Sequence, residues 1–361
     1  MDLFSWGWTH YFEAMWNSKE RGSEVPARVI SQQKKFWAIA GGFGECWAEP
    51  SGKLRLEAEE GADWPAVGDW VVATVSEEAD SGTIQEVLPR KSKFVRKTAG
   101  RVTQEQVLAT NIDTALLVSA LDGDFNPRRV ERYLAQCWES GAKPVILLNK
   151  ADVCANAAAR AAEMERVAAG AAVYIASAKS GLGFEGLEKH LSRGQTLCLL
   201  GSSGVGKSTI VNRLMGRAIQ ETNEVRESDS RGRHTTSARE LFALPGGALL
   251  IDTPGLRELQ LWDSDEGVSR AFADIESLAA QCRFSNCRHE AEPGCTIRQA
   301  IASGALDEGR LDNWRKLLRE QAFLRQKLDP EARQEQKEKW KKIHRAARQK
   351  YQQRDRDGGK R

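Results

Sequence analysis

The chain has 361 residues, of which 41% are hydrophobic, and its formal net charge at pH 7 is only +3. This length suits two or three domains with buried cores. No apolar run is long enough to cross a bilayer, and the amino terminus lacks the basic segment of a secretory signal, so neither a membrane-spanning nor an exported protein is expected.

Aromatic side chains crowd the first 24 residues. Five large residues follow a roughly helical spacing: Phe4, Trp8, Tyr11, Phe12 and Met15. This spacing predicts an amphipathic helix. We expect it to pack on its own protein, and docking to a membrane or a partner is the alternative.

Residues from about 25 to 90 predict a small closed β-barrel. Six short segments with glycine turns between them predict strands: VPARVI, KFWAIAG, GECWAEP, GKLRLEA, VGDWVVATV and GTIQEVLP. Such barrels present a strand face to oligonucleotides, so Phe36, Trp37 and Trp47 are candidates for stacking on bases. For each of them alone, a place in the core is the commoner role. Composition does not distinguish an oligonucleotide-binding fold from an SH3-like barrel.

Two apolar strands end in loops that fit the recognition of guanine. The segment KPVILLNKAD ends in Asn149, Lys150 and Asp152. A carboxylate at Asp152 can accept from both the ring N–H and the exocyclic amine of guanine, a donor pair that adenine does not offer. This N-K-x-D pattern is weak alone. The next strand, AVYIASAKSG, ends in three further candidates for contact with the base: Ser177, Ala178 and Lys179.

The stretch LCLLGSSGVGKSTIVNRL fits a strand, a phosphate-binding loop and a helix. Gly201, Gly206, Lys207 and Ser208 match G-x-x-x-x-G-K-S in the context that this pattern requires; the alternative is a glycine-rich turn with a chance lysine. Backbone N–H groups and the helix N-terminus would face the phosphates, Lys207 would reach the terminal ones, and Ser208 would bind Mg²⁺. The predicted GTP contacts in this segment are Gly201, Ser202, Ser203, Gly204, Val205, Gly206, Lys207, Ser208 and Thr209.

Two downstream segments fit the parts of a GTPase that sense the γ-phosphate. The polar segment SRGRHTTSARE offers Thr235 and Thr236 as ligands of Mg²⁺ and predicts a loop ordered by the γ-phosphate; an ordinary surface loop is the alternative. The strand LLIDTPGL ends in Asp252 and Gly255. These suit a carboxylate near Mg²⁺ and a backbone N–H aimed at the γ-phosphate.

The motifs occur in the order base, base, phosphate, switch, switch, whereas in an ordinary GTPase the N-K-x-D segment comes last. A parallel α/β sheet tolerates this order, because each strand keeps its neighbours when the old termini are joined and new ones are cut at a surface loop. We therefore predict a multidomain α/β protein with an N-terminal barrel, a circularly permuted P-loop GTPase domain with a mostly parallel sheet, and a C-terminal helical module.

The C-terminal module contains a candidate zinc site. Cys282, Cys287, His289 and Cys295 have the spacing C-x4-C-x-H-x5-C, and three thiolates with one imidazole are a closed ligand set for one structural zinc ion. The alternative is three reduced cysteines and a surface histidine. Seven cysteines in total fit a reducing cytoplasm rather than a disulfide framework. Leucines at helical spacing from Leu306 onward predict a helix that packs on this module.

Basic residues concentrate in two segments. Residues 89–101 contain six Lys or Arg and no acid, and residues 331–361 carry a surplus of seven positive charges. One such run alone is usually a solvated face. Two of them on either side of a GTPase domain favour contact with RNA phosphates, because binding releases counterions.

This arrangement resembles the circularly permuted GTPases, and the flanking modules look like those of the ribosome small-subunit-dependent GTPase A family, from about residue 25 to the end. The resemblance implies an oligonucleotide-binding fold in the barrel, and the cysteine and histidine spacing matches the zinc motif of the family. It also implies a cytoplasmic protein whose partners are GTP, GDP, the small ribosomal subunit and its rRNA, with a checkpoint role in late small-subunit maturation. No membrane partner is expected, and we assume a monomer. The predicted units are 1–24, 25–100, 101–275, 276–330 and 331–361.

Hydrolysis requires a water placed in line with the γ-phosphate. Leu256 stands where many GTPases have a glutamine, so unstimulated turnover should be slow. His234 is the nearest candidate to replace it, which the G-x-H-T-T pattern of the family supports; a loop histidine without a catalytic role is the alternative. Lys207 and Thr236 complete the catalytic candidates. The opposing hypotheses are a nucleic-acid-binding zinc protein with a regulatory guanine-nucleotide site, and a P-loop kinase or ATPase.

Overall fold

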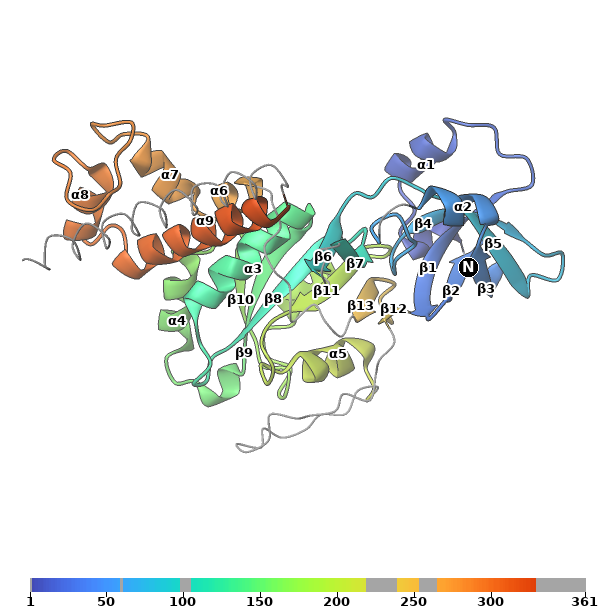
Figure 1. Ribbon diagram of the computed structural model, residues 1–361. Coiled ribbons are helices and arrows are strands. Elements are labelled where there is room, and N and C mark those ends of the chain that lie inside the picture. Colours follow the sequence, from blue (N-terminus) through green and yellow to red (C-terminus); the bar gives the residue numbers. More distant parts are fainter. Residues whose placement is uncertain (1, 59–60, 98–104, 219–238, 253–264, 329–361) are drawn as a thin grey trace, which may run out of the picture.

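The computed structural model describes residues 2–58, 61–97, 105–218, 239–252 and 265–328. Within them an N-terminal barrel, a central sheet flanked by helices, and a helical module follow one another in space (Figure 1). The barrel and the central part share one run of eleven paired strands, because β1 (Val25–Gln33) pairs antiparallel with β12 (Arg239–Ala243). None of the described helices is both long and apolar enough to span a membrane.

The barrel closes in the strand order β1, β2, β3, β5, β4 and back to β1. These pairs are antiparallel except for β3 with β5. The remaining bounds are β2 Phe36–Gly41, β3 Gly44–Pro50, β4 Trp70–Val75 and β5 Ser81–Val87. Inward side chains such as Val29, Ile39 and Ile84 fill the interior. This closed five-stranded barrel confirms the oligonucleotide-binding fold.

One predicted strand of the barrel is a helix. The segment GKLRLEA forms α2 (Gly52–Glu57), and the prediction of a strand there was wrong. The Ser51 hydroxyl caps α2 by accepting from the Leu54 N–H at 3.1 Å, and a serine cap favours a helix start. The alternation of leucines was misleading, because Leu54 is buried whereas Leu56 is 87% exposed.

The aromatic residues of the barrel divide between core and surface. Trp37 is buried, and its indole N–H donates to the Pro65 carbonyl at 2.8 Å. Phe36 and Trp47 are 48% and 44% exposed. The core role therefore holds for Trp37, and stacking on bases stays a prediction for the other two.

The N-terminal extension packs on its own protein, as expected. It forms a 3-10 helix, η1 (Leu3–Trp6), and a short helix, α1 (His10–Trp16), with Gly7 in the left-handed conformation between them, so the single predicted helix is two pieces. Trp8 lies edge-on to Trp70 of the barrel at a centroid distance of 4.6 Å. Both belong to the core cluster that continues into the central part.

The first basic segment is partly used inside the protein. The Arg90 guanidinium donates to both carboxylate oxygens of Asp69, at 2.8 and 2.7 Å, and Lys91 pairs with Asp113 at 3.2 Å. The next residues form β6 (Lys93–Lys97), which pairs antiparallel with β7 (Glu105–Thr110). Because these cations neutralise internal acids, the segment offers less free charge to RNA than its composition suggests.

The central part is a doubly wound sheet in the order β10, β9, β8, β11, β13, all parallel, with β12 antiparallel at the barrel side. The bounds are β8 Thr114–Ala120, β9 Lys143–Asn149, β10 Ala172–Ile175, β11 Thr196–Leu200 and β13 Leu249–Asp252. Successive residues face opposite layers: Leu117 packs in the cluster that contains α3 (Pro127–Ser140), and Leu116 in the cluster that contains α5 (Lys207–Met215). Burial on both faces accounts for the apolar runs, and the mostly parallel sheet is confirmed.

Three further helical segments belong to the described central part: the 3-10 helix η2 Ala151–Val153, α4 Ala157–Glu165 and the 3-10 helix η3 Glu185–His190. The C-terminal module is helical, as predicted. Its helices are α6 Asp265–Ala271, α7 Ala273–Ala279, α8 Thr296–Ala302 and α9 Glu308–Leu328. The long α9 lies beside α3 and carries the predicted leucines, of which Leu311 and Leu317 are fully buried (Figure 1). The predicted domain boundaries stay predictions.

Candidate nucleotide and metal sites

Asn149, predicted to contact the base, lies against the phosphate loop. It ends β9 and is buried, and its carboxamide nitrogen donates to the Val205 carbonyl at 2.8 Å. Its carboxamide oxygen accepts from the Ala178 N–H at 2.9 Å. One side chain therefore joins the three loops predicted to hold base and phosphates, at the carboxyl edge where ligands of open α/β sheets bind.

The base loop is held by two further polar contacts. The Ser177 hydroxyl donates to the Asp152 carboxylate at 2.6 Å, which fixes the proposed guanine acceptor. Lys150 has a left-handed backbone, and its ammonium donates to Asp122 at 2.6 Å. Burial raises the pKa of Asp122, but the hydrogen bond and charge of Lys150 outweigh it and hold this pKa below its ordinary value. Asp122 is therefore an anion at neutral pH.

The phosphate loop occupies residues 201–206, between β11 and α5. At Gly206 the backbone φ is +96°, and a Cβ there would lie 2.4 Å from the Asn149 carboxamide nitrogen. At Gly201 a Cβ would lie 2.5 Å from the Val118 carbonyl oxygen. The two glycines of the motif are thus required by close approach of neighbouring loops as well as by backbone conformation.

Lys207 begins α5 and turns back over the loop. Its ammonium donates to the Gly201 carbonyl at 2.7 Å and also to the Ser202 carbonyl. Ser208 and Thr209 follow in the first turn of α5, where backbone N–H groups have no helical acceptor. Asp252 ends β13, which is the parallel neighbour of β11, so it lies on the same edge of the sheet. The exposed Ser203 and Gly204 form the tip of the loop.

Two arginines at the site were missed by the sequence analysis. Arg129 of α3 donates to Asp124 at 2.7 Å and to the Ser202 hydroxyl at 2.5 Å. Arg213 of α5 donates to the Ala178 carbonyl at 2.9 Å, close to Lys179. Neither belongs to a nucleotide-binding motif. The Asn126 N-cap before Pro127 was the available signal for Arg129, because it predicts a helix start right after β8.

Four predicted residues lie outside the described part of the chain: His234, Thr235, Thr236 and Gly255. Their roles stay predictions that rest on the sequence. The described part supplies the base loops, the phosphate loop and Asp252.

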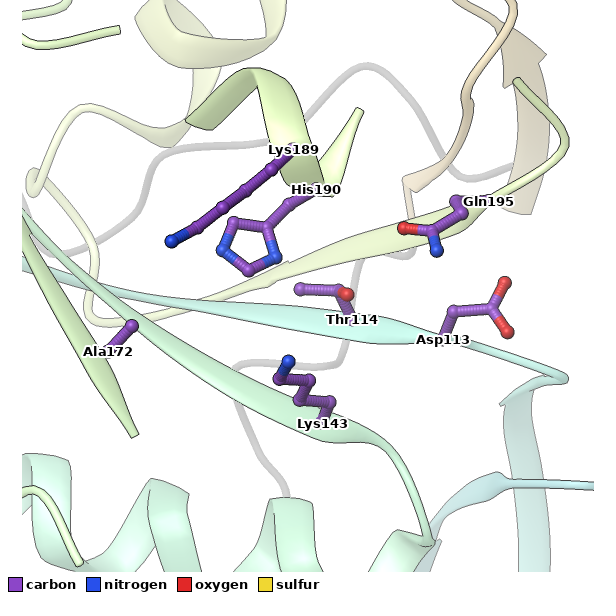
Figure 2. Close-up of a pocket in the computed structure, with 7 residues that line it drawn as sticks. All are labelled: Asp113, Thr114, Lys143, Ala172, Lys189, His190 and Gln195. Carbon is purple, nitrogen blue, oxygen red and sulfur yellow. The ribbon is translucent and has the colours of Figure 1, made fainter. Parts of the chain in front are cut away.

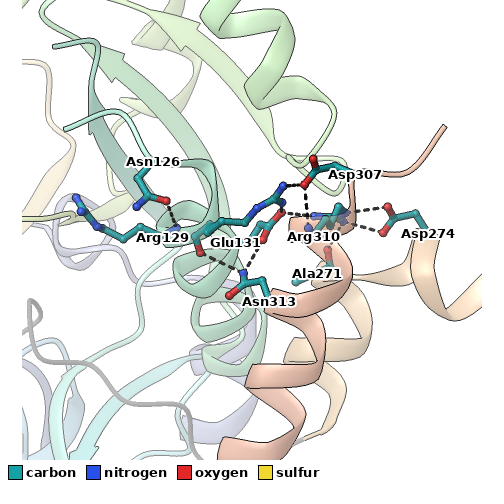
Figure 3. Close-up of polar contacts among 9 residues, drawn as sticks. Asn126, Arg129, Glu131, Ala271, Asp274, Asp307, Arg310 and Asn313 are labelled. Atoms are coloured by element: carbon teal, nitrogen blue, oxygen red, sulfur yellow. Dashed lines mark hydrogen bonds and ion pairs between the residues drawn. The ribbon is translucent and has the colours of Figure 1, made fainter. Parts of the chain in front are cut away.

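A charged network joins α3 to the C-terminal module (Figure 3). The fully buried Glu131 of α3 accepts from Arg310 of α9 at 2.8 Å, and its other oxygen accepts from Asn313 at 2.5 Å. Arg310 also donates to both oxygens of Asp274 at 2.9 and 2.7 Å. Burial lowers the pKa of Arg310, but Asp274 and Glu131 more than offset this and raise it above its ordinary value. The same helix that touches the phosphate loop through Arg129 therefore holds α9.

The cysteine and histidine cluster has the dimensions of a tetrahedral zinc site. The candidate ligand atoms of Cys282, Cys287, His289 and Cys295 all lie within 4.8 Å of one another. The sulfurs of Cys282 and Cys295 are 3.9 Å apart, and the Nδ1 of His289 is 3.6 Å from each. Zn–S and Zn–N bonds of about 2.3 and 2.0 Å in a tetrahedron imply S–S and S–N separations of about 3.8 and 3.5 Å. The residues present fit such an ion.

The surroundings of the cluster also suit metal ligands. Burial and the charge of Arg315 lower the pKa of His289, which favours the neutral imidazole that binds metals. Burial raises the pKa of Cys282, but hydrogen bonds from groups that include the N–H groups of Thr296 and Ile297 outweigh this effect. The pKa of this thiol therefore lies below its ordinary value. Burial raises the pKa of Cys287 to about 11, and a bound metal would deprotonate this thiol.

Known proteins are similar to this chain over nearly its whole length. A family model described as RsgA GTPase matches residues 87–262. A small ribosomal subunit biogenesis GTPase RsgA from Opitutus terrae is 44% identical over 357 residues, which cover 96% of this chain and 97% of that protein. The chain belongs to the RsgA GTPase family. A protein of the same name from Syntrophotalea carbinolica is also 44% identical, over 94% of this chain and 95% of that protein.

Two solved structures have a similar fold. The crystal structure of YjeQ from Thermotoga maritima has a TM-score of 0.62 and 26% identity, and the match covers 83% of this chain and 99% of that one. The crystal structure of YloQ, described as a circularly permuted GTPase, has a TM-score of 0.58 and 21% identity over 84% of this chain and 96% of that one. These similarities confirm the permuted GTPase fold.

A second family model, described as ABC transporter, matches residues 184–356. The overlap with the RsgA match includes the phosphate loop, a motif that many nucleotide-binding proteins share. The family assignment therefore rests on the relatives that match almost from end to end.

Proposed function

We propose that this protein is a cytoplasmic, monomeric GTPase that acts in biogenesis of the small ribosomal subunit, and that binding to the subunit and its rRNA stimulates its hydrolysis of GTP. The bridge that Asn149 makes between the base loop and the phosphate loop carries the nucleotide part of this proposal, since it fits one guanine nucleotide across both loops. The names of the relatives from two organisms support the ribosomal part.

In this proposal each polar group has one task. Asp152 accepts from guanine, Lys207 and the first turn of α5 hold the phosphates, and Ser208 with Asp252 and Thr235 or Thr236 holds Mg²⁺. When bound, Mg²⁺ neutralises charge on the β- and γ-phosphates. His234 positions the attacking water in place of the glutamine that Leu256 replaces. Stimulation is needed because this residue must be docked by the RNA surface.

The four residues of the cysteine and histidine cluster hold one structural zinc ion in this proposal. All four positions of a tetrahedron are filled by protein, so no position is open for a substrate. The ion keeps α7 and α8 together and gives α9 a folded base. Phe36 and Trp47 of the barrel are the proposed stacking surfaces for RNA.

Helix α3 is the proposed connection between nucleotide and C-terminal module. Its first turn touches the phosphate loop through Arg129 and Ser202, and its next turn holds α9 through Glu131 and Arg310. A shift of the phosphate loop would be passed on by one rigid helix. This route complements the direct chain connection from β13 into α6.

The deciding experiment measures GTP turnover with and without purified small ribosomal subunits. A large stimulation by the subunit is expected, and no change at saturating subunit concentration would refute the proposal. His234→Ala should reduce stimulated turnover and leave GTP affinity nearly unchanged, because the residue is proposed to act on the water. The matched control is His10→Ala on the exposed surface of α1, which should change neither quantity.

The alternative is an RNA-binding zinc protein whose guanine-nucleotide site only regulates binding. The exposed aromatic residues of the barrel favour it. Under this alternative, GTP changes the affinity for the subunit while His234→Ala leaves that change intact and turnover stays at its basal rate. Competition by ATP equal to that by GTP would instead remove the guanine-reading role of Asp152.

A further inference from the structure

A cavity of about 310 Å³ opens at the edge of the central sheet opposite the nucleotide site (Figure 2). Its walls come from the starts of β8, β9 and β10, the end of η3 and the turn before β11. The lining residues are Asp113, Thr114, Lys143, Ala172, Lys189, His190 and Gln195. None of them belongs to the predicted GTP or metal sites.

The cavity is lined by donors from two sides. Lys189 and His190 come from η3, and Lys143 reaches toward them from β9 across the cavity (Figure 2). Within the described part of the chain, the Lys143 ammonium and the Gln195 carboxamide have no hydrogen-bond or ion-pair partner. The Lys189 ammonium lies over the Tyr174 ring at 5.3 Å, which leaves its N–H groups free for a ligand.

Two lining side chains are almost completely buried and yet face the cavity. Thr114 is 3% exposed, and its hydroxyl has no hydrogen-bond partner among the described residues. His190 is 5% exposed, and its Nε2 lies 3.3 Å from the Tyr174 hydroxyl, so its other ring nitrogen is available. Because these two residues line the cavity while the rest of each side chain is buried, their unused polar atoms are available to a polar ligand there.

The single acid of the cavity does not oppose an anion. Asp113 accepts from the Thr196 N–H at 2.8 Å and pairs with Lys91 at 3.2 Å, so its charge is balanced within the protein. Lys143 and Lys189 are then the uncompensated charges. Burial, Lys143 and Lys189 together lower the pKa of His190, which is the response of an imidazole to a positive field.

We propose that this cavity binds a phosphate group, held by Lys143, Lys189, His190 and Thr114. Its volume admits a phosphate with part of an attached group, either a free phosphate ester or a phosphodiester of an RNA strand. The site lies on the same strands as the nucleotide site but at their amino ends, so both can be filled at once. The proposal does not depend on GTP hydrolysis.

The test follows the Cε1–H signals of histidine by NMR in the full-length protein, with GDP and Mg²⁺ filling the nucleotide site. The chain has only 5 histidines, and His190→Gln assigns the relevant signal. Inorganic phosphate is added at constant ionic strength against sodium chloride. Binding should raise the pKa of His190, because a nearby anion favours the imidazolium. In a second arm, an oligoribonucleotide without terminal phosphates is added in place of phosphate.

The variant Lys143→Gln/Lys189→Gln should weaken binding by about tenfold or more for each charge-assisted hydrogen bond lost. The matched control Lys53→Gln alters an exposed lysine of the barrel and should change nothing. A response to phosphate alone identifies a small phosphorylated ligand, and a response to the oligoribonucleotide identifies RNA; both support the site. No response of His190 to either probe, or an equal response to chloride or in the double variant, overturns the proposal.

Discussion

The central domain meets the barrel and the C-terminal module through two junctions that differ in their contacts. At the barrel side, β1 continues the central sheet through β12, and a cluster of aromatic residues around Trp70 covers the seam. At the side of the C-terminal module, α3 and α9 meet through the buried ion pair of Glu131 and Arg310, beside apolar residues of the same cluster such as Leu311 and Leu317. Apolar burial stabilises by about 25 cal/mol per Å², whereas a buried ion pair contributes little net free energy after desolvation. Because both sides bury apolar residues, the barrel side should be the more rigid junction through its continuous strand pairing.

Each junction buries one arginine, and the partners of the two differ. Arg28 at the barrel side donates to neutral oxygens: the Trp6 carbonyl at 2.7 Å, the Asn111 carbonyl at 3.3 Å and the Thr196 hydroxyl at 3.2 Å. Burial lowers its pKa to about 10, so it remains charged at neutral pH. Arg310 instead has two carboxylates. Of these two buried arginines, only Arg310 depends on charge pairing, so its junction is the one suited to open and close.

The largest effect should follow removal of the metal. Cys295→Ala deletes a buried member of the proposed zinc site at the start of α8, and structural zinc sites contribute roughly 10 kcal/mol of apparent folding free energy. Hydrogen exchange should show loss of protection in α7 to α9 and unchanged protection in the barrel. The control Cys154→Ala removes a cysteine outside the cluster and should retain zinc by metal analysis. A folded, zinc-free module would contradict this expectation.

The next effect tests the charged junction. Arg310→Met leaves the buried Glu131 with Arg128 as its remaining cation, so the cost in unfolding free energy should be at the lower end of the range for a broken buried pair, about 3 kcal/mol. The double variant Glu131→Met/Arg310→Met removes both charges and should recover most of that loss. Urea unfolding of the two variants measures the difference. If the double variant is as unstable as the single one, the pair is not the element that holds this junction.

A smaller effect is expected at the barrel junction. Arg28→Met leaves neutral oxygen acceptors unpaired, but it leaves no carboxylate without a cation. The loss of unfolding free energy should therefore be about 2 kcal/mol. Arg28→Lys keeps the charge but not the three-way contact, and it should recover only part of the loss. The same unfolding measurement applies. A greater loss for Arg28→Met than for Arg310→Met would reverse the comparison between the junctions.

The smallest effect concerns a surface ion pair between extension and barrel. Burial raises the pKa of Glu86, but hydrogen bonds from Lys19 and Arg21 outweigh it, so this pKa lies below its ordinary value of 4.5. The stabilisation is complete above that value and is lost as the pH falls through the folded-state pKa. Because Glu86 is partly exposed, Glu86→Gln should change the unfolding free energy at pH 7 by less than about 1 kcal/mol. The decrease in unfolding free energy that protonation of Glu86 causes in acid should be absent in this variant.

The motif-bearing parts of the fold were the predictable ones. Strands such as β9 and β11 are buried on both faces and end in glycine or polar loops, so their sequence specifies both the element and its edge. The prediction for α2 was wrong because two leucines at alternate positions fit a strand as well as a short helix. The Ser51 cap favours the helix. Short segments carry too little periodicity to settle this choice.

Contacts between distant segments could not be predicted from the sequence. Arg129 reaches the site from the first turn of α3, for which the Asn126 cap gave a local signal. Arg213 reaches it from the last turn of α5, and no local pattern distinguishes Arg213 from a surface arginine. Likewise, the sequence did not show that Arg90 of the basic segment 89–101 pairs with Asp69 inside the protein. Such pairings depend on tertiary geometry, which a charge count does not contain.

The shared strand β12 has a further consequence. Its first residue, Arg239, comes three positions after Thr236, and its register places Arg239 opposite Gln32 of the barrel. On its other side, Glu240 is paired with Asp252. The short strand β12 therefore pairs with the barrel along one edge and, along the other, with the strand that carries a predicted magnesium ligand. If Thr235 or Thr236 binds Mg²⁺ as proposed, a change in that contact would therefore act close to the strand that joins the central sheet to the barrel.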